Sequence, residues 1–509
     1  MGISGFTSNV YRWPITIFAL VTMAVADAQS PGGQQWPSAW TLAPDTATSM
    51  NKSATLTYIP GSSVKLYQIN GDCDWPEWDA TNTNPTPTCK PTVSQTATRA
   101  DVLGDDVATS FENNGELIMM FGDTIGATGG FYPAYIDFEN TFAWDAHDPI
   151  ARSTTQKASD GLLLDFFLSG NHALEVLPPL QPDGTAVDMG PFDVPDAGIS
   201  LNGQIYISAK TGHTTTSDTS DYAVLVKFDE AHQTFSSGRT TSALPEGHFV
   251  TVAWYETPDW IPGDPASVGP EPEVVTFGLG IYRASNIYLS MIPASDFESG
   301  VGWDGKSATR YFTGMSQGQP TWSQNESDSV PIVTDLDPAN PTIGNLSAFY
   351  SKQLRLWLMT FDGGRNLDGT GGAFFTYAPH PWGPWSTPQL IFNSCRDRAL
   401  GNFIFYYYQT EARNDCPSAM PTGVTSAPNW AGPAGPMFNP SANDPLTTRG
   451  AEYAPLMVER FTEITGNTLK IYYTLSTWNP YAVVLMESDF TIARPSPWDP
   501  FPPWPGMPF

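Results

Sequence analysis

The sequence predicts an all-β fold built from several small sheets. Short apolar or alternating runs rich in Val, Ile, Tyr, Phe and Trp recur along the chain, and turns of Gly, Pro, Asn and Asp separate them. Long helical periodicity is absent from nearly the whole sequence, and no linker divides it into separate domains. Sheets of about four strands repeated around an axis have this appearance in sequence, so we predict a five-bladed β-propeller. A large β-sandwich or jelly roll is the alternative architecture.

Five clusters of strand-forming residues carry the blade prediction, and each contains a strand, a tight turn such as Asn114-Gly115 or Asn202-Gly203, and a second strand. The clusters are DVATSFENNGELIMMFGDT from Asp106, VPDAGISLNGQIYISAKTG with YAVLVKFD from Val194, HFVTVAWYETPDW with EVVTFGLGIYRASNIYLSMIP from His248, NLSAFYSKQLRLWLMTFDGG with GGAFFTYAPHPWGPWS from Asn345, and AEYAPLMVERFTEITGNTLKIYYTLSTWNPYAVVLMESDF from Ala451. We therefore predict one domain over residues 29–493, including an N-terminal extension pinned by a disulfide. Residues 494–509 are rich in Pro and Trp and are predicted to form an extended strap.

The first 28 residues have the pattern of a signal peptide. Arg12 precedes an apolar run from Ile15 to Ala26, and small-residue sites follow at Ala24-Val25-Ala26 and Ala26-Asp27-Ala28. The run is shorter than the roughly 20 apolar residues that span a bilayer. We therefore expect a secreted, extracellular protein that does not insert in a membrane. A buried N-terminal strand is the alternative interpretation.

The four cysteines agree with export. Cys73 lies near Cys89 in the sequence and Cys395 lies near Cys416, so we expect two local disulfides that pin loops in an oxidising compartment. A metal site is the alternative, but the chain lacks C-x-x-C spacing and contains only 6 His. We predict no metal and no cofactor. Sequons that suit a secreted glycoprotein occur at Asn51, Asn325 and Asn345.

The charge of the chain excludes some classes of partner. A formal net charge of −29 repels nucleic acid and anionic membranes. The sequence has no P-loop, no dinucleotide fingerprint and no G-x-S-x-G elbow. With 17 Trp, 20 Tyr and 28 Phe, some aromatic rings are available to stack on sugars, although most such rings belong to cores. We expect a monomer with a glycan partner.

The segment GDDVATSFENNGELIMMFGDT brings two carboxylates together. Asn114-Gly115 is a favoured two-residue hairpin turn, because both of its positions need positive φ. Counting outward from that turn, Asp106 lies directly opposite Asp123. If the loop instead has three residues and a bulge, Asp105 faces Asp123. Either register places two carboxylates at the open end of one hairpin.

Two facing carboxylates are costly unless they have a use. Like charges across a strand pair destabilise it, and one of the two groups binds its proton more tightly. Glycoside hydrolysis needs such a pair, because one acid protonates the leaving oxygen while the other attacks the sugar or activates water. The alternative is that Asp123-Thr124 caps a turn and that the side chains of Asp105 and Asp106 point into solvent.

The same segment resembles the start of a glycoside hydrolase family of endo-D-arabinanases, which was first catalogued as a domain of unknown function. The resemblance rests on Asp105 and Asp106 followed one hairpin later by Phe121-Gly122-Asp123-Thr124, and on the late motifs Glu452-Tyr453-Ala454-Pro455 and Trp478-Asn479-Pro480-Tyr481. It implies a five-bladed propeller, D-arabinan or another furanose-rich polysaccharide as substrate, and Asp123 with Asp105 or Asp106 as the catalytic acids. Val107-Ala108 replaces the apolar-Gly step expected there, so the choice between the two first acids stays open.

Other residues are weaker candidates for binding a sugar. An aromatic ring can stack on a sugar, an Asn can bond a hydroxyl, and charged groups can line the axial pocket, although inter-blade packing or surface ion pairs explain the same residues. These candidates are Trp478, Asn479, Tyr481, Glu452, Asp196 and Arg283. A carbohydrate-binding propeller without catalysis, lectin-like or of the cell wall, is the alternative function.

Overall fold

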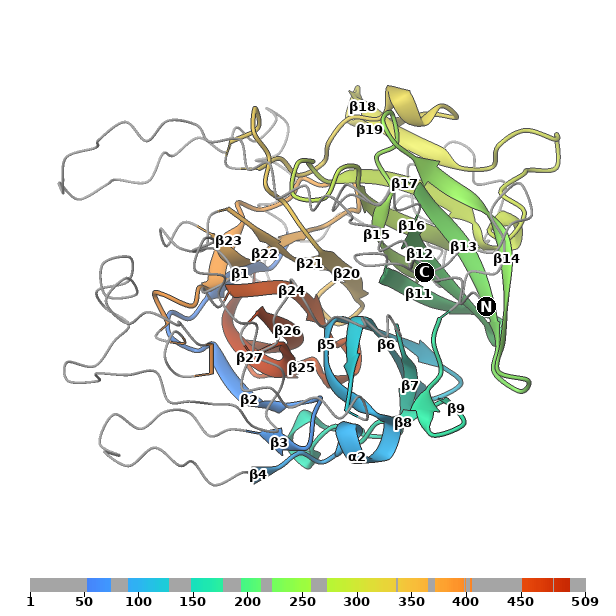
Figure 1. The fold of residues 1–509 in the computed structure, drawn as a ribbon. Helices are drawn as coiled ribbons and strands as arrows, with labels where there is room; N and C mark the ends of the chain where they lie inside the picture. The colour runs from blue at the N-terminus through green and yellow to red at the C-terminus, as the bar shows by residue number, and fades with distance from the viewer. Residues whose placement is uncertain are drawn as a thin grey trace, which may run out of the picture.

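The computed structural model describes residues 53–74, 90–127, 148–176, 194–211, 222–257, 272–335, 337–364, 371–397, 399, 403–404, 451–478 and 480–494. Within these ranges the chain forms five antiparallel sheets that follow one another around an axis (Figure 1). The structure therefore confirms the predicted all-β class and the five-bladed β-propeller. The predicted signal peptide and residues 495–509 of the Pro/Trp-rich strap lie outside the described residues.

The first two blades follow chain order from the innermost strand outward. The first sheet contains β5 (Val102–Asn113), β6 (Glu116–Gly126), β7 (Ile150–Ser153) and β8 (Asp165–Phe166). The second contains β11 (Val194–Leu201), β12 (Gln204–Thr211), β13 (Tyr222–Asp229) and β14 (Thr234–Ala243). Both clusters of strand-forming residues predicted for this part of the chain are thus blades.

The third and fourth blades repeat this order. The third contains β15 (Thr251–Thr257), β16 (Glu273–Leu279), β17 (Tyr288–Pro293), β18 (Arg310–Ser316) and β19 (Gln319–Ser323). The fourth contains β20 (Leu346–Ser351), β21 (Leu356–Gly363), β22 (Gly372–Ala378) and β23 (Gln389–Phe392).

The fifth blade joins the two ends of the chain. From the axis outward it runs β24 (Ala451–Met457), β26 (Thr468–Trp478) and β27 (Ala482–Ala493), and β25 (Glu463–Thr465) pairs with β26. The N-terminal strands β1 (Thr55–Tyr58) and β2 (Val64–Gln68) both pair with β27, and Figure 1 shows them beside the C-terminal strands. Sequence analysis did not predict that the N-terminal strands close the ring.

Short elements accompany the blades. They are β3 (Cys73–Asp74), β4 (Lys90–Pro91), β9 (Leu168–Ser169), β10 (His172–Ala173), α2 (Thr96–Ala100), η1 (Ala158–Asp160), η2 (Ala294–Asp296), η3 (Glu326–Asp328) and η5 (Glu459–Phe461). Among the described residues, no helix has the length and apolar character needed to cross a membrane.

The hydrophobic core lies between neighbouring blades. Each of the five interfaces has its own cluster of buried apolar side chains, and the cluster between the fourth and fifth blades includes Leu56 of β1. Hydrogen bonds join the innermost strand of the first blade to the last blade. The backbone N–H of Val107 donates to Ser476 Oγ at 2.9 Å, and Thr474 Oγ1 donates to the carbonyl of Ala108 at 2.7 Å. The site at the axis therefore depends on a closed ring.

Ring closure predicts a large effect from a small N-terminal change. Leu56 of β1 is buried while its neighbour Thr57 is exposed. Leu56→Ala should lower the free energy of unfolding by about 2–5 kcal/mol, because it leaves a cavity where the two ends of the chain meet. Thr57→Ala is the control and should change it by about 0.5 kcal/mol or less. Chemical denaturation measures both, and equal effects would contradict this role of β1.

Candidate functional site

The predicted acids gather at one face of the propeller, which we call the axial face. Neighbouring strands are antiparallel, so the start of an innermost strand and the end of the next strand lie at the same face. Asp105 and Asp106 lie near the start of β5, and Asp123 lies near the end of β6. The starts of β11 and β24 add Asp196 and Glu452.

The hairpin of the first blade has the predicted turn but not the predicted register. Asn113 pairs with Glu116, and Asn114 and Gly115 have φ of 50° and 85°. Farther from the turn, however, Asp106 pairs with Gly122 and not with Asp123. The prediction that Asp106 lies directly opposite Asp123 is therefore wrong.

The bulge at Val107 in β5 causes this difference, and a second bulge, in β6, restores the original register beyond it. Between the pairs Thr109–Met120 and Asp106–Gly122, β5 has one more residue than β6, and the bulged Val107 has φ of 45°. Between Asp106–Gly122 and Gly104–Ile125 the extra residue belongs to β6, where Asp123 has φ of 35°. Asp105 thus stands opposite the bulged residues of β6. Each bulge changes the direction of the strand next to an aspartate, at Asp106 in β5 and at Asp123 in β6.

Asp106 is held by hydroxyl groups of the last blade. Tyr453 Oη donates to Asp106 Oδ2 at 2.8 Å, and the hydroxyl of Tyr481 also bonds this carboxylate. Its other oxygen, Oδ1, is buried without a hydrogen bond among the described residues. Burial raises the pKa of Asp106 to about 6, while the two tyrosines and the charges of Lys210 and Arg283 oppose that rise. Asp106 therefore titrates near neutral pH.

Asp105 is sealed inside the protein. Its side chain is 0% exposed, against 7% for Asp106. Asn70 Nδ2 donates to Asp105 Oδ1 at 2.7 Å, and Asn70 Oδ1 in turn accepts the backbone N–H of Val483 at 3.0 Å. Burial, followed by the nearby Asp106, raises the pKa of Asp105 well above its usual range. Asp105 is therefore a buried group that joins the first blade to the last, and Asp106 is the acid at the axial face.

Asp123 is paired with a carboxylate that sequence analysis missed. The backbone N–H of Asp123 donates to Asp148 Oδ1 at 2.8 Å, and Asp148 lies just before β7. Burial, followed by the charge of Asp123, raises the pKa of Asp148 well above its usual range. Burial, followed by the charge of Asp106 and with a smaller contribution from Asp123, raises the pKa values of Tyr453 and Tyr481, the two tyrosines that bond Asp106. Asp106 and Asp123 therefore belong to one electrostatic group.

Two cations complete this group. Lys210, at the end of β12, lies 4.8 Å from the ring centroid of Tyr282, and the guanidinium of Arg283 lies 5.0 Å from the same centroid. Arg283 Nη2 is 3.6 Å from Asp362 Oδ2 at the end of β21. Burial raises the pKa of Asp362, against the charge of Arg283. Four different blades thus contribute charges to the axial face.

The backbone around Asp106 is strained. Val107, Asp123, Arg283 and Ala454 all have positive φ, between 35° and 53°. Non-glycine residues in this region cost of order 1–3 kcal/mol each, and they cluster at functional sites. A valine there is particularly unfavourable, because its Cβ is branched. The strained residues therefore lie among the same charged side chains at the axial face.

The sequence matches one protein-family model over residues 92–487, which is most of the 509-residue chain. The model is described as "Domain of unknown function (DUF4185)". The chain belongs to this family. The match confirms the resemblance seen in the sequence at the level of the family and its five-bladed fold, and it includes Asp105, Asp106 and Asp123.

Solved structures that resemble this member of the DUF4185 family include three sugar-active proteins. A putative glycoside hydrolase from Bacteroides ovatus is 8% identical, with 85% of this chain and 96% of that chain covered and a TM-score of 0.36. An endo-1,5-alpha-L-arabinanase from Thermotoga petrophila is 9% identical, with 80% and 76% covered and a TM-score of 0.36. An alpha-L-arabinofuranosidase from Podospora anserina is 10% identical, with 86% and 97% covered and a TM-score of 0.34. No curated protein matches the sequence. At such TM-scores the likenesses say nothing about activity, and the fold rests on the strand pairing.

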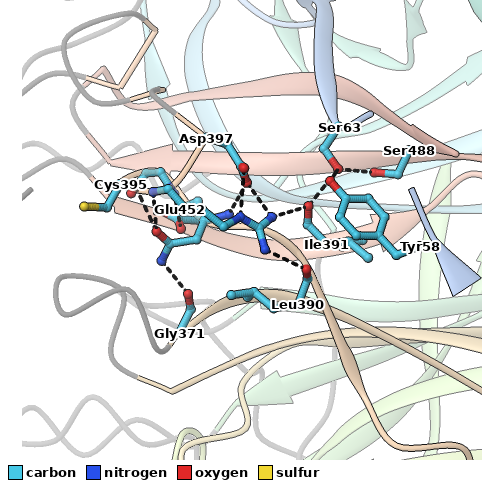
Figure 2. A network of polar contacts seen from close by, with 12 residues as sticks. Tyr58, Ser63, Gly371, Leu390, Ile391, Cys395, Asp397, Glu452 and Ser488 are labelled. Atoms are coloured by element: carbon cyan, nitrogen blue, oxygen red, sulfur yellow. Dashed lines mark hydrogen bonds and ion pairs between the residues drawn. The ribbon is translucent and has the colours of Figure 1, made fainter. Parts of the chain in front are cut away.

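Glu452 lies in a different network from Asp106. Side chains alternate along a strand, so Glu452 and Tyr453 leave β24 on opposite faces. Glu452 Oε1 accepts the backbone N–H of Ser394 at 2.8 Å, and Figure 2 shows it beside the turn that carries Cys395 and Asp397. Burial raises the pKa of Glu452 to about 7, against the Ser394 hydrogen bonds. Its position suits a structural link between the fourth and fifth blades better than sugar binding.

Of the other predicted binding residues, Asp196 and Trp478 contact the protein itself. Asp196 Oδ2 accepts the backbone N–H of Val252 at 2.7 Å, which joins the second and third blades, and burial raises its pKa to about 7 against the charge of Lys210. Trp478 packs edge-on against Tyr481, with ring centroids 5.7 Å apart. Tyr481 is itself fully buried. Asn479 lies outside the described residues.

The described residues include two of the four cysteines and two of the three sequons. Cys73 and Cys395 are each disulfide-bonded, while Cys89 and Cys416 lie outside the described residues, so the local pairing stays a prediction. Of the sequons, Asn325 is exposed and stays a prediction, and Asn51 lies outside the described residues. Asn345 is 2% exposed, so its burial argues against the predicted glycan there. Within the described ranges, no group of three or more His, Cys, Asp or Glu side chains is arranged to hold a metal ion.

The close approach of Gly122 to Asp106 gives a test of this geometry. A Cβ at Gly122 would lie 2.5 Å from Val194 Cγ1 and 2.9 Å from Asp106 Oδ1. Gly122→Ala should therefore lower the free energy of unfolding by about 1–3 kcal/mol. Gly126→Ala, in the same strand with its nearest neighbour at 3.4 Å, is the control and should have the smaller effect. Thermal denaturation compares them, and a stable Gly122→Ala protein would contradict the described register.

Proposed function

We propose that this protein is a secreted glycoside hydrolase that cleaves a furanose-rich polysaccharide, with D-arabinan as the first substrate to test. The observation that carries the proposal is the pair of acids that one hairpin supplies to a single electrostatic group at the axial face, each in a different environment. The motif resemblance supports the substrate class. The apolar run before Ala26 and the disulfide-bonded cysteines support the extracellular location.

Asp106 has the environment of the group that acts as a carboxylate. Two tyrosine hydroxyls donate to it, and two cations favour its charged form. Its Oδ1 is buried and makes no hydrogen bond among the described residues, so this oxygen is not already paired within them. We assign it as the nucleophile or the general base, and the configuration of the released sugar distinguishes these two roles.

Asp123 is the second acid that the hairpin brings to the axial face. Its backbone N–H bonds Asp148, and the charges of Asp123 and Asp106 both act on the pKa of Asp148. We assign Asp123 as the general acid that protonates the glycosidic oxygen, and Asp148 as a positioning residue.

The central prediction concerns three neighbouring aspartates. Asp106→Asn and Asp123→Asn should each reduce cleavage of D-arabinan by about 100-fold or more, because each removes a group that moves a proton or attacks the sugar. Asp105→Asn is the matched control and should retain activity within about threefold, since that side chain is fully buried against Asn70 and does not reach the axial face. Reducing-end release from purified proteins measures all three.

The outcome of that assay separates the enzyme from a binding protein. Full activity of Asp123→Asn would show that the acid is misassigned. Tight glycan binding by the wild type without reducing-end release from arabinans, arabinogalactans or other wall polysaccharides would contradict the enzymatic proposal. That result would favour the carbohydrate-binding alternative.

The pH dependence of activity tests the role of Tyr453. Activity should fall as the pH drops through about 6, because Asp106 then gains a proton. Tyr453→Phe removes a donor that stabilises the charged form, so it should move this acid limb to higher pH. The shift should be about one unit, since a hydrogen bond to a charged group contributes about 1.5–3 kcal/mol and one unit is about 1.36 kcal/mol.

A second tyrosine controls for the loss of a buried hydroxyl. Tyr473 is also buried, and its hydroxyl bonds Ser488 in the fifth blade. Tyr473→Phe should leave the pH profile unchanged. An acid limb that stays in place in Tyr453→Phe would contradict the assignment of Asp106 as the essential carboxylate.

A further inference from the structure

The turn between β16 and β17 reaches across the axial face. It is a closed turn, in which the backbone N–H of Ala284 donates to the carbonyl of Ile281 at 3.1 Å and that of Gly280 donates to Ser285 Oγ at 3.0 Å. The turn is pressed against its own blade, because a Cβ at Gly280 would lie 2.6 Å from the carbonyl oxygen of Gly247. Tyr282 and Arg283 occupy its two central positions.

These two side chains contact three other blades. Tyr282 lies against Lys210 of the second blade. Arg283 pairs with Asp362 of the fourth blade and lies 5.9 Å from the ring centroid of Tyr453 in the fifth. Asp106 of the first blade acts on the pKa of Tyr282. The turn therefore forms a wall of the axial site and not a surface loop remote from it.

The guanidinium of Arg283 has N–H groups that can donate hydrogen bonds to a ligand. The Arg283 side chain is 49% exposed, while that of Asp362 is 5% exposed, so the guanidinium faces solvent from a buried anchor. The 3.6 Å distance to Asp362 is longer than a hydrogen bond. A guanidinium has five N–H donors, and the described groups that act on its charge are Tyr282, Asp362 and Tyr453. Several donors at the axial face are therefore available to a ligand.

The surroundings decide the class of ligand. Asp106 and Asp362 both lie near Arg283, and the whole chain carries a net charge of −29, so an anionic substituent would meet a negative field. Neutral hydroxyl groups of a sugar accept hydrogen bonds from a guanidinium without that penalty. We infer that Arg283, positioned by Tyr282 and Asp362, binds the hydroxyls of an uncharged sugar residue beside the residue at Asp106. This inference rests on the proposed function for its substrate.

Arg283 has a counterpart of the same backbone conformation elsewhere in the fold. Arg283 has φ of 53°, a conformation that the turn imposes on a residue with no glycine-like freedom. Arg355 offers a matched comparison, because it is an exposed arginine with φ of 56° in the turn between β20 and β21. That turn precedes β21, whereas Asp362 lies near the end of the same strand, so Arg355 lies at the opposite face of the propeller.

Binding to an uncleaved ligand tests the inference. In an Asp123→Asn background, isothermal titration with short D-arabinofuranose oligosaccharides should show at least tenfold weaker binding after Arg283→Ala. Arg355→Ala should bind like the background protein. Arg283→Lys keeps the charge but loses the planar fork of donors, so it should restore only part of the affinity. In the otherwise wild-type enzyme, Arg283→Ala should raise KM more than it lowers kcat.

Each outcome separates this inference from the proposed function. If the wild type cleaves the polysaccharide but Arg283→Ala binds as tightly as the background, the inference is wrong and the enzyme assignment stands. If the wild type cleaves nothing but sugar binding is lost with Arg283, the inference stands and the enzyme assignment fails. If no oligosaccharide is cleaved or bound, both are overturned. Full rescue by Arg283→Lys would assign Arg283 a purely electrostatic role and would overturn the inference.

Discussion

Burial of carboxylates where the blades meet at the axis is the constraint on which this structure depends. A buried acid is tolerated only when hydrogen bonds and opposite charges compensate for lost hydration. Asp106 receives that compensation from tyrosines of the last blade, and Asp105 receives it from Asn70, which follows β2. Neither partner is in place until the ring is closed. The N-terminal strands thus stabilise the site as well as the fold, because β1 and β2 complete the blade that carries those tyrosines.

The environments of the two acids follow from their neighbours. Asp106 lies among hydroxyl donors and cations, whereas Asp123 lies beside a second carboxylate. One hairpin supplies both acids, yet groups outside that hairpin set their environments. Because their environments differ, one aspartate can act as the acid and the other as the base. The two bulges make this possible, since a regular ladder would have aligned the strands without re-aiming either stretch.

Much of the fold could be predicted from the sequence. The alternation of apolar residues and the turns such as Asn114-Gly115 are local signals, and all five clusters of strand-forming residues are blades. Closure by β1 was not predictable in the same way, because pairing between residues more than 400 positions apart leaves no local pattern. The late motif containing Glu452 and Tyr453 pointed to the right strand, but strand alternation sends Tyr453, and not Glu452, toward Asp106.

The details of the site were harder to predict. A valine at positive φ contradicts local preference, so nothing in the sequence indicated the bulge at Val107 that changes the register. Asp148 has no motif of its own and meets Asp123 only through the arrangement of β6 and β7. Tyr282 and Lys210 come together across blades. Residues placed by tertiary contacts and not by spacing are those that sequence analysis missed.

The electrostatic coupling of Asp106 to its neighbours is open to direct measurement. Carbon-13 NMR of the aspartate carboxyl groups, with the Asp106 signal assigned by its loss in Asp106→Asn, reports the pKa of that side chain. We expect titration near pH 6 in the wild type, and a higher pKa in Tyr453→Phe, because that variant lacks a hydroxyl that stabilises the charged form. Titration near the ordinary value of about 4 in both proteins would contradict a shared buried site and the mechanism built on it.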